Sequence, residues 1–174
     1  PEAEENRIKF IGKFESRLGK NRRLIISENV HSGNVVIVDK NSPKIIPRTD
    51  GLITDDEEVV LGSTFADCLV GYFYDPVNRL IGIGHSGYKG ILAEIFINLI
   101  EKMKDCGSDP ENILVFVGPF ICKKHYEFGP EAKKTFWLMR HHIRSISNSE
   151  RYLVDLKGMI LEQIMFLGEI PEEN

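Results

Sequence analysis

Three side chains able to hold a metal ion or attack a substrate lie in the first half of the chain: His31, Cys68 and His85. Each stands beside an apolar run that is typical of a β-strand, and His85 lies in a glycine-rich turn. Three protein ligands that leave one position open are the pattern of a catalytic rather than a structural zinc. A histidine near a cysteine can also prepare a thiolate nucleophile. Both chemistries remain open from these residues alone.

The segments around Cys68 and His85 predict how these two side chains meet. Residues 68–74 (CLVGYFY) and 79–84 (RLIGIG) read as strands, and Asp75-Pro76-Val77-Asn78 between them reads as a turn. Such a hairpin brings Cys68 and His85 to the same end of neighbouring strands. Because antiparallel neighbours lie about 5 Å apart, both side chains would reach one ion.

A helix is predicted directly after His85. Apolar residues from Ile91 to Met103 recur at helical spacing, Gly107 ends the run, and the first turn is GYKG. The free N–H groups and partial positive charge of a helix N-terminus favour a bound anion. The sequence therefore predicts an anion-binding turn beside His85.

The remaining pattern mixes strands and helices. Strands are predicted at 23–27, 35–38, 49–54 and, as a buried strand, 113–117; residues 59–61 are a further apolar segment; a loop is predicted at 40–49; helices are predicted at 3–15, 130–139 and 151–167. Because several turns look like hairpins, the fold class expected is α+β, with mixed sheets flanked by helices rather than a doubly wound parallel sheet. Residues 1–174 are expected to form a single domain.

The charge and composition of the chain argue against several functional classes. The net charge is −4 with no basic block, so a nucleic-acid partner is not expected, and no apolar run is long enough to span a bilayer. The acidic start PEAEENRIKF does not resemble a signal peptide. The odd number and wide spacing of Cys68, Cys106 and Cys122 argue against a disulfide framework, so reduced thiols and a cytoplasmic location are expected.

Five short motifs follow one another along the chain. They are Val30-His31, Phe65-Ala66-Asp67-Cys68-Leu69-Val70, His85-Ser86-Gly87-Tyr88-Lys89-Gly90, Gly118-Pro119-Phe120-Ile121 and Tyr126-Glu127-Phe128-Gly129. In order and spacing they resemble one family, the YfiH-type laccase-domain proteins, also named multicopper polyphenol oxidases and purine nucleoside phosphorylases. The resemblance runs from about Asn6 to Gly168.

The resemblance implies a fold, a metal and an activity. The fold would be an α/β sandwich similar to a bacterial toxin's cysteine deamidase domain. His31, Cys68 and His85 would bind zinc, with copper less favoured, and would form the catalytic trio. The activity would be phosphorolysis of purine nucleosides, with adenosine deamination as a side activity. Lys89 and Tyr126 would contact the small-molecule substrate and phosphate.

The chain also departs from the family pattern. Phe65, Val70, Tyr88 and Lys89 stand where the family has Thr, Pro, Trp and Arg. Lysine keeps the positive charge but lacks the two-pronged grip of arginine on phosphate. Two family segments are also expected to be missing, one before Asn6-Arg7 and one after the last helix. A multicopper cluster is not expected, because such centres need many more than the five histidines of this chain.

Several other polar residues are candidates for a role in the site. Asp67 is a candidate to orient a metal ligand, while Tyr126-Glu127 and Asp155 are candidates to line a pocket or anchor a loop. No catalytic role is expected for the other residues. Cys106 and Cys122 are expected to pack, and His125 and the pair His141-His142 are expected at the surface. Gly82 and Gly84 are expected to form a plain turn, because their spacing does not fit a Rossmann fingerprint.

Two other functional classes compete with the phosphorylase. In one, Cys68 is a nucleophile with His85 as its base, and the protein is a metal-free hydrolase of amide bonds such as those of peptidoglycan precursors. In the other, the chain is a catalytically inactive binding module. Thiol alkylation separates the first from a zinc enzyme, because a free thiolate reacts faster than a metal-bound one.

Overall fold

The computed structural model describes residues 22–166 and 170–171, together with residues 5–6, 9, 12–14 and 16–17. The helix predicted over 3–15 therefore lies largely outside the described residues. The strands are β1 (Arg23–Ser27), β2 (Val35–Ile37), β3 (Ile45–Ile46), β4 (Gly51–Thr54), β5 (Val59–Gly62), β6 (Leu69–Asp75), β7 (Leu80–Ser86), β8 (Leu114–Val117), β9 (Glu127–Phe128), β10 (Ile143–Ser145) and β11 (Tyr152–Val154). The helices are α2 (Tyr88–Leu92), α3 (Ile95–Asp105), α4 (Ala132–Thr135) and α5 (Leu156–Phe166), with 3₁₀ turns η1 (Pro110–Asn112) and η2 (Trp137–His142).

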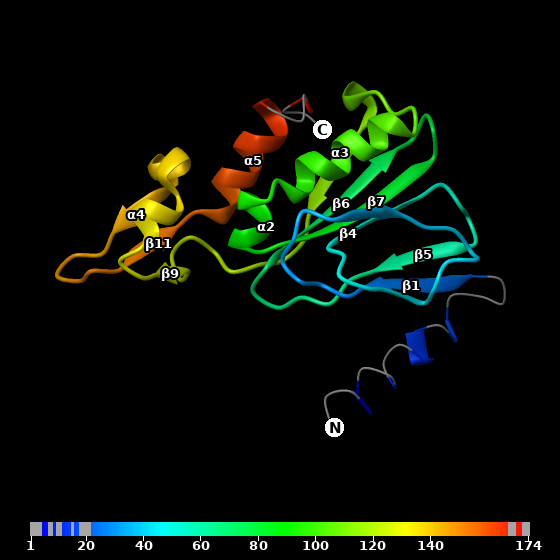
Figure 1. The fold of residues 1–174 in the computed structure, drawn as a ribbon, viewed down its shortest axis with the longest axis horizontal. Helices are drawn as coiled ribbons and strands as arrows, with labels where there is room; N and C mark the ends of the chain where they lie inside the picture. The colour runs from blue at the N-terminus through cyan, green and yellow to red at the C-terminus, as the bar shows by residue number, and fades with distance from the viewer. Residues whose placement is uncertain are drawn as a thin grey trace.

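A five-stranded mixed sheet in the order β2-β4-β7-β6-β8 forms the centre of the fold. Only β2 and β4 pair in parallel within it. A parallel sheet of order β3-β1-β5 and an antiparallel sheet of order β10-β11-β9 complete the described strands. Figure 1 shows α3 on one side of the central sheet and the β1–β5 layer on the other. This arrangement confirms the predicted α+β class with mixed sheets flanked by helices.

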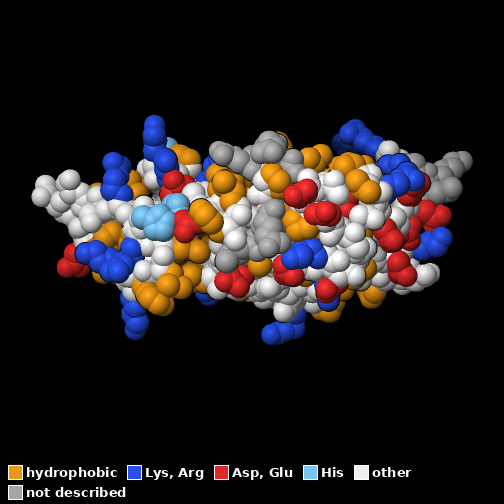
Figure 2. Space-filling model, turned by 90° about the horizontal axis from the view of Figure 1, so that it is seen from above, with side chains coloured by type: hydrophobic (Ala, Val, Ile, Leu, Met, Phe, Trp, Pro, Cys, Tyr) orange, Lys and Arg blue, Asp and Glu red, His pale blue; other side chains and the backbone are white. Residues whose placement is uncertain are grey.

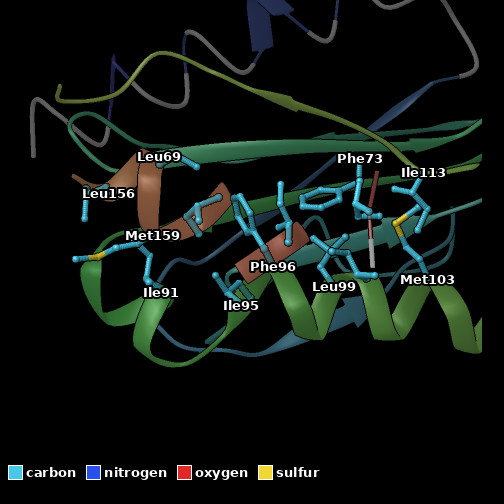
Figure 3. Packing of buried hydrophobic residues seen from close by; sticks show 14 of the residues in the cluster. Leu69, Phe73, Ile91, Ile95, Phe96, Leu99, Met103, Ile113, Leu156 and Met159 are labelled. Carbon is cyan, nitrogen blue, oxygen red and sulfur yellow. The ribbon is translucent and has the colours of Figure 1, made fainter. Parts of the chain in front are cut away.

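Consecutive apolar residues explain why the central sheet buries both faces. In β4, Leu52 packs with the β1 layer, whereas its neighbour Ile53 belongs to the core under the helices. Successive side chains of a strand point to opposite faces, so each strand contributes to both cores. On the helix side, Phe96 of α3 meets Phe73 of β6 edge to face, with ring centroids 5.1 Å apart, and Figure 3 shows this packing.

The hairpin formed by β6 and β7 is the element that was predicted to position the site. Its strands pair antiparallel, with Leu69 opposite Ser86 and Val70 opposite His85. Asp75 closes the turn by accepting hydrogen bonds from the backbone N–H groups of Val77 and Asn78. The prediction that the hairpin sets Cys68 and His85 at one end is therefore confirmed.

The helix after His85 differs from its prediction. The apolar periodicity runs through two helices, α2 and α3, which are separated by Glu94 in the left-handed region with φ of 53°. The α2 helix has only five residues, and few aligned peptides contribute to the potential at its N-terminus. The prediction of one long helix is wrong, although Gly107 ends α3 as predicted, with φ of 96°.

Most of the other corrections lie in the second half of the chain. Residues 151–155 were predicted as helix, but 152–154 form β11, and the helix begins only at Leu156. The helix predicted over 130–139 is the short α4 followed by η2. The strand predicted as buried at 113–117 is β8 at the edge of the central sheet, with Leu114 and Phe116 exposed. The predicted loop at 40–49 includes β3, which pairs with β1.

None of the described helices is both long and apolar enough to cross a membrane.

Candidate functional site

His31, Cys68 and His85 come together in the structure. The Sγ atom of Cys68 lies 3.7 Å from Nε2 of His31, and the rings of His31 and His85 meet edge to face with centroids 5.0 Å apart. One ligand atom from each of the three side chains lies within 4.8 Å of the other two. The residues come from the loop after β1, the residue before β6, and the end of β7.

A buried aspartate that the sequence analysis did not single out, Asp50, holds two of these residues in place. Its carboxylate accepts hydrogen bonds from the backbone N–H groups of His31 at 3.0 Å and Ser32 at 2.7 Å, and from the Ser32 hydroxyl at 2.8 Å. The same carboxylate lies 2.9 Å from Nδ1 of His85. Because Nδ1 of His85 is engaged, Nε2 is the atom left to bind a ligand.

The electrostatics of Asp50 follow from these contacts. Burial alone would raise its pKa, but hydrogen bonds from His85, Ser32 and His31 outweigh that effect and hold the pKa below its usual value. Asp50 is thus a fully buried carboxylate that is ionised at neutral pH. Asp67, the predicted orienting residue, is exposed, and its backbone oxygen accepts the N–H of Ile121.

The backbone around the trio is tightly fitted. His31 has φ of 60°, a left-handed conformation that asparagine, aspartate and histidine tolerate better than most residues. A Cβ atom added at Gly87 would lie 2.8 Å from Cys68 Sγ and 3.1 Å from His31 Cδ2. Glycine at position 87 therefore leaves the space that the thiol and the imidazole occupy.

The donor set fits a zinc ion. Two imidazole nitrogens and one thiolate are ligands that zinc prefers, and an orienting carboxylate behind a ligand histidine is common at zinc sites. Burial, followed by the charge of Asp67, raises the pKa of the Cys68 thiol. A cation among the three donors would counteract this effect, because metal binding requires the thiolate form.

A cavity of ≈ 330 Å³ opens beside the trio. Its wall includes His31, Cys68, Lys89 and Tyr126, so both predicted substrate contacts share one cavity with two residues of the trio. Burial raises the pKa of Tyr126 to about 12, which keeps its hydroxyl protonated as a hydrogen-bond donor.

The rest of that wall is mainly apolar, with Ile121, Tyr88 and Leu156 contributing. The Tyr88 ring packs edge to face on Phe128, at a centroid distance of 5.0 Å. A second hollow of ≈ 440 Å³ includes His85 as well as His31 and Cys68.

The other candidate residues, Glu127 and Asp155, have structural partners. Glu127 pairs with Arg151 at 3.0 Å. Asp155 pairs with Lys123 at 3.0 Å and accepts the N–H of Gly158 at the start of α5.

The packing role expected for Cys106 and Cys122 is wrong, because both are exposed, and Cys122 Sγ lies 3.0 Å from Nδ1 of His125. His141 lies at the surface, as expected, whereas His142 is largely covered, and both contact Glu162.

The chain belongs to the family of multi-copper polyphenol oxidoreductase laccase proteins, whose model matches residues 2–173. It is similar to a protein from Rickettsia prowazekii named purine nucleoside phosphorylase, with 30% identity over 162 residues that cover 89% of this chain and 66% of that protein. It is also 39% identical over 77 residues, or 44% of the chain, to 28% of the Bacillus subtilis purine nucleoside phosphorylase YlmD.

Solved structures share the fold. The Bacillus licheniformis protein YfiH superposes with a TM-score of 0.82 at 24% identity, covering 91% of this chain and 64% of that one. YlmD from Geobacillus stearothermophilus gives 0.78 at 26% identity, covering 87% and 61%. The chain thus spans about two thirds or less of the length of each of these four relatives. The family predicted from the five motifs is confirmed.

Proposed function

We propose that this chain is a zinc-dependent purine nucleoside phosphorylase that acts on adenosine, inosine or guanosine, with adenosine deamination as a side activity. The observation that carries the proposal is the convergence of His31, Cys68 and His85 beside a cavity that also presents Lys89 and Tyr126. The names of the relatives from Rickettsia prowazekii and Bacillus subtilis support the same class of reaction.

Each residue of the site has a proposed role. His31, Cys68 and His85 would hold zinc, and Asp50 would orient the His85 ring. When bound, zinc would supply a Lewis acid beside the substrate. In phosphorolysis a phosphate oxygen bonds to the sugar C1′ while the bond from C1′ to the purine nitrogen breaks, and the base leaves with the bonding electrons.

The cavity wall suits the two substrates. Lys89 presents an exposed ammonium group that would attract and hold phosphate. The apolar side chains of Tyr88, Ile121 and Leu156 would pack against a purine, and the Tyr126 hydroxyl would donate a hydrogen bond to a ring nitrogen. Because Lys89 belongs to the single-turn helix α2, its side chain rather than a helix dipole would attract the anion.

The first test is zinc content and product formation in the wild-type chain and in a Cys68→Ala variant. Expected for the wild type is about one zinc per chain at this site, with free purine base and sugar phosphate formed from nucleoside plus phosphate. The variant should lose this zinc and the activity together. Zinc-loaded wild type that releases neither a base with phosphate nor inosine from adenosine without it would refute the proposal.

The phosphate contact is tested separately at Lys89. We expect Lys89→Ala to raise KM for phosphate by about tenfold, the size of one lost charge-assisted contact, with little change in KM for the nucleoside. Lys89→Arg should retain or lower KM for phosphate, because arginine keeps the charge and grips phosphate with two donors. Equal effects on both substrates would contradict this role.

The metal-free cysteine hydrolase has one observation in its favour, the distance of 3.7 Å between Cys68 Sγ and His31 Nε2. In that case the histidine beside the thiol is His31 rather than the predicted base, His85. Iodoacetamide distinguishes the two classes. Slow alkylation of Cys68 that speeds up after zinc removal supports the zinc site, whereas fast alkylation regardless of zinc supports the hydrolase.

A further inference from the structure

A second cluster of metal-binding side chains lies at the junction of η2 and α5. His141 and His142 are the last two residues of η2, and Glu162 lies within α5. The two histidines differ in solvent exposure: the side chain of His141 is 59% exposed and that of His142 is 16% exposed. Figure 2 shows a patch of histidine surface beside acidic and basic side chains on the α4 side of the molecule.

The three side chains converge on one point. Nε2 of His141 lies 2.5 Å and Nε2 of His142 lies 2.6 Å from the same carboxylate oxygen, Oε2 of Glu162. The two rings are in contact, with centroids 4.2 Å apart. One ligand atom from each residue lies within 4.8 Å of the other two, as in the trio at the first site.

The backbone fixes His142 in this cluster. Its carbonyl oxygen accepts the N–H of Asp155 at 2.9 Å, which ties the end of η2 to the residue that precedes α5. A Cβ atom added at Gly158 would lie 2.5 Å from Nδ1 of His142, so the ring rests directly on a glycine of α5. A larger residue at position 158 would push this ring away from Glu162.

The Glu162 carboxylate favours a cation over an anion at the point where the two Nε2 atoms meet it. His141 and His142 also line a cavity of ≈ 370 Å³ whose wall includes Lys123, Lys124 and Arg144, so groups of both signs surround the cluster, and Lys123 is paired with Asp155. The two Nε2 atoms approach the Glu162 oxygen, and a negative carboxylate there would repel an anion.

We propose that His141, His142 and Glu162 form a second site for a divalent transition metal ion such as Zn²⁺, separate from the His31–Cys68–His85 site. Two imidazoles and one carboxylate are a ligand set that zinc uses, and imidazole also suits copper and nickel. Bonds of about 2.0–2.1 Å would place tetrahedral ligand atoms ~3.3 Å apart, so small rotations would open the cluster to admit the ion. Each neutral imidazole would bind the ion through Nε2 and keep its proton on Nδ1.

The experiment uses the full chain with Cys68→Ala, which removes a ligand of the first site. Zinc affinity is measured by competition with a chromogenic chelator. We expect this protein to retain about one zinc per chain. Adding Glu162→Gln or His141→Ala should weaken binding at least tenfold, since losing even an outer partner of a ligand costs about 10–100-fold. Matched controls are Glu150→Gln and His125→Ala, which change exposed residues outside the cluster and should leave the affinity unchanged.

Two further readouts do not depend on enzyme activity. Zinc should raise the thermal midpoint of the Cys68→Ala protein and should have a smaller effect once Glu162→Gln is added, because an ion that binds only the folded chain stabilises it. Cobalt bound to the Cys68→Ala protein should show visible ligand-field bands without thiolate charge-transfer absorption, since no cysteine belongs to this cluster.

Three results would overturn the second site. The Cys68→Ala protein could bind no zinc while remaining folded by circular dichroism. It could bind zinc with an affinity that Glu162→Gln and His141→Ala leave unchanged. Inorganic phosphate, rather than zinc, could raise the midpoint in a way that depends on His141. Because His141 is largely exposed, its alanine variant tests the ligand without endangering the fold. None of these outcomes bears on nucleoside phosphorolysis at the first site.

Discussion

The two histidine clusters use similar ligands at different depths. At the first, His85 is buried and Asp50, which is fully buried, holds both His85 and the backbone on either side of His31. At the second, Glu162 both contacts the two histidines and is itself a proposed ligand, so within the described part of the chain it has no equivalent of the orienting role of Asp50. A buried orienting carboxylate fixes ligand geometry before the ion arrives, whereas an exposed cluster must be ordered by the ion itself.

The largest expected effect is that of Asp50→Asn. The amide would keep the size but would set its NH₂ against backbone donors and would lose the charged acceptor of His85. We expect a loss of about 3 kcal/mol in the free energy of unfolding, measured in urea on metal-free protein. Glu162→Gln, the equivalent change at the exposed cluster, should cost no more than about 1 kcal/mol. Equal losses would remove the contrast between the two clusters.

The pH dependence of stability sharpens the same contrast. The folded-state pKa of Asp50 lies below its usual 3.8, so its contribution is fully present above that value and is lost as pH falls through the folded pKa. The difference in unfolding free energy between wild type and Asp50→Asn should therefore be constant near neutral pH and should shrink below about pH 3.8. A difference that stays constant down to pH 2 would show that the carboxylate charge is not what stabilises the loop.

The next effect is on catalysis, through Gly87→Ala. The added methyl would press on Cys68 Sγ and His31, and the φ of −85° at this position already suits alanine. We expect phosphorolysis to fall about tenfold or more, because small displacements at a reacting site have large effects on rate. Gly90→Ala in the adjoining helix α2 is the control, since its methyl would meet Ser86 Oγ at 3.1 Å and no side chain of the trio. Similar losses in both variants would point to a general effect on α2.

The smallest effect is expected from Gly158→Ala. Its methyl would displace the His142 ring from Glu162, while alanine inside a helix favours the fold by roughly 0.5–1 kcal/mol. Zinc affinity at the second cluster should fall about threefold, with phosphorolysis unchanged. Affinity is measured in the Cys68→Ala background, and an unchanged value would mean that the ring position does not control binding there.

The parts of the fold and site that could be predicted were those encoded by local pattern. The apolar runs at residues 68–74 and 79–84, with a turn between them, predicted the hairpin, and with it the approach of Cys68 to His85. The apolar periodicity after His85 predicted helix, but periodicity is insensitive to one left-handed residue, so the break at Glu94 was missed. Residues 152–154 were missed because a three-residue strand is defined by its partners β9 and β10.

Asp50 could not be recognised from sequence for a related reason. Next to Gly51 it has the signature of a turn, and nothing local distinguishes a solvated turn aspartate from a buried one. Its role depends on His85, 35 residues later, and on the loop around His31, 19 residues earlier. The pairing of β4 with β7 makes that arrangement, because it places Asp50 at the end of the strand opposite His85.

The left-handed backbone of His31 affects how any scan of this position must be read. At φ of 60° alanine is strained by about 1 kcal/mol or more, so His31→Ala would combine a lost imidazole with a loosened loop. Asparagine tolerates this conformation and carries no imidazole. The difference between His31→Asn and His31→Ala therefore separates the chemistry of the side chain from the geometry of the chain that presents it.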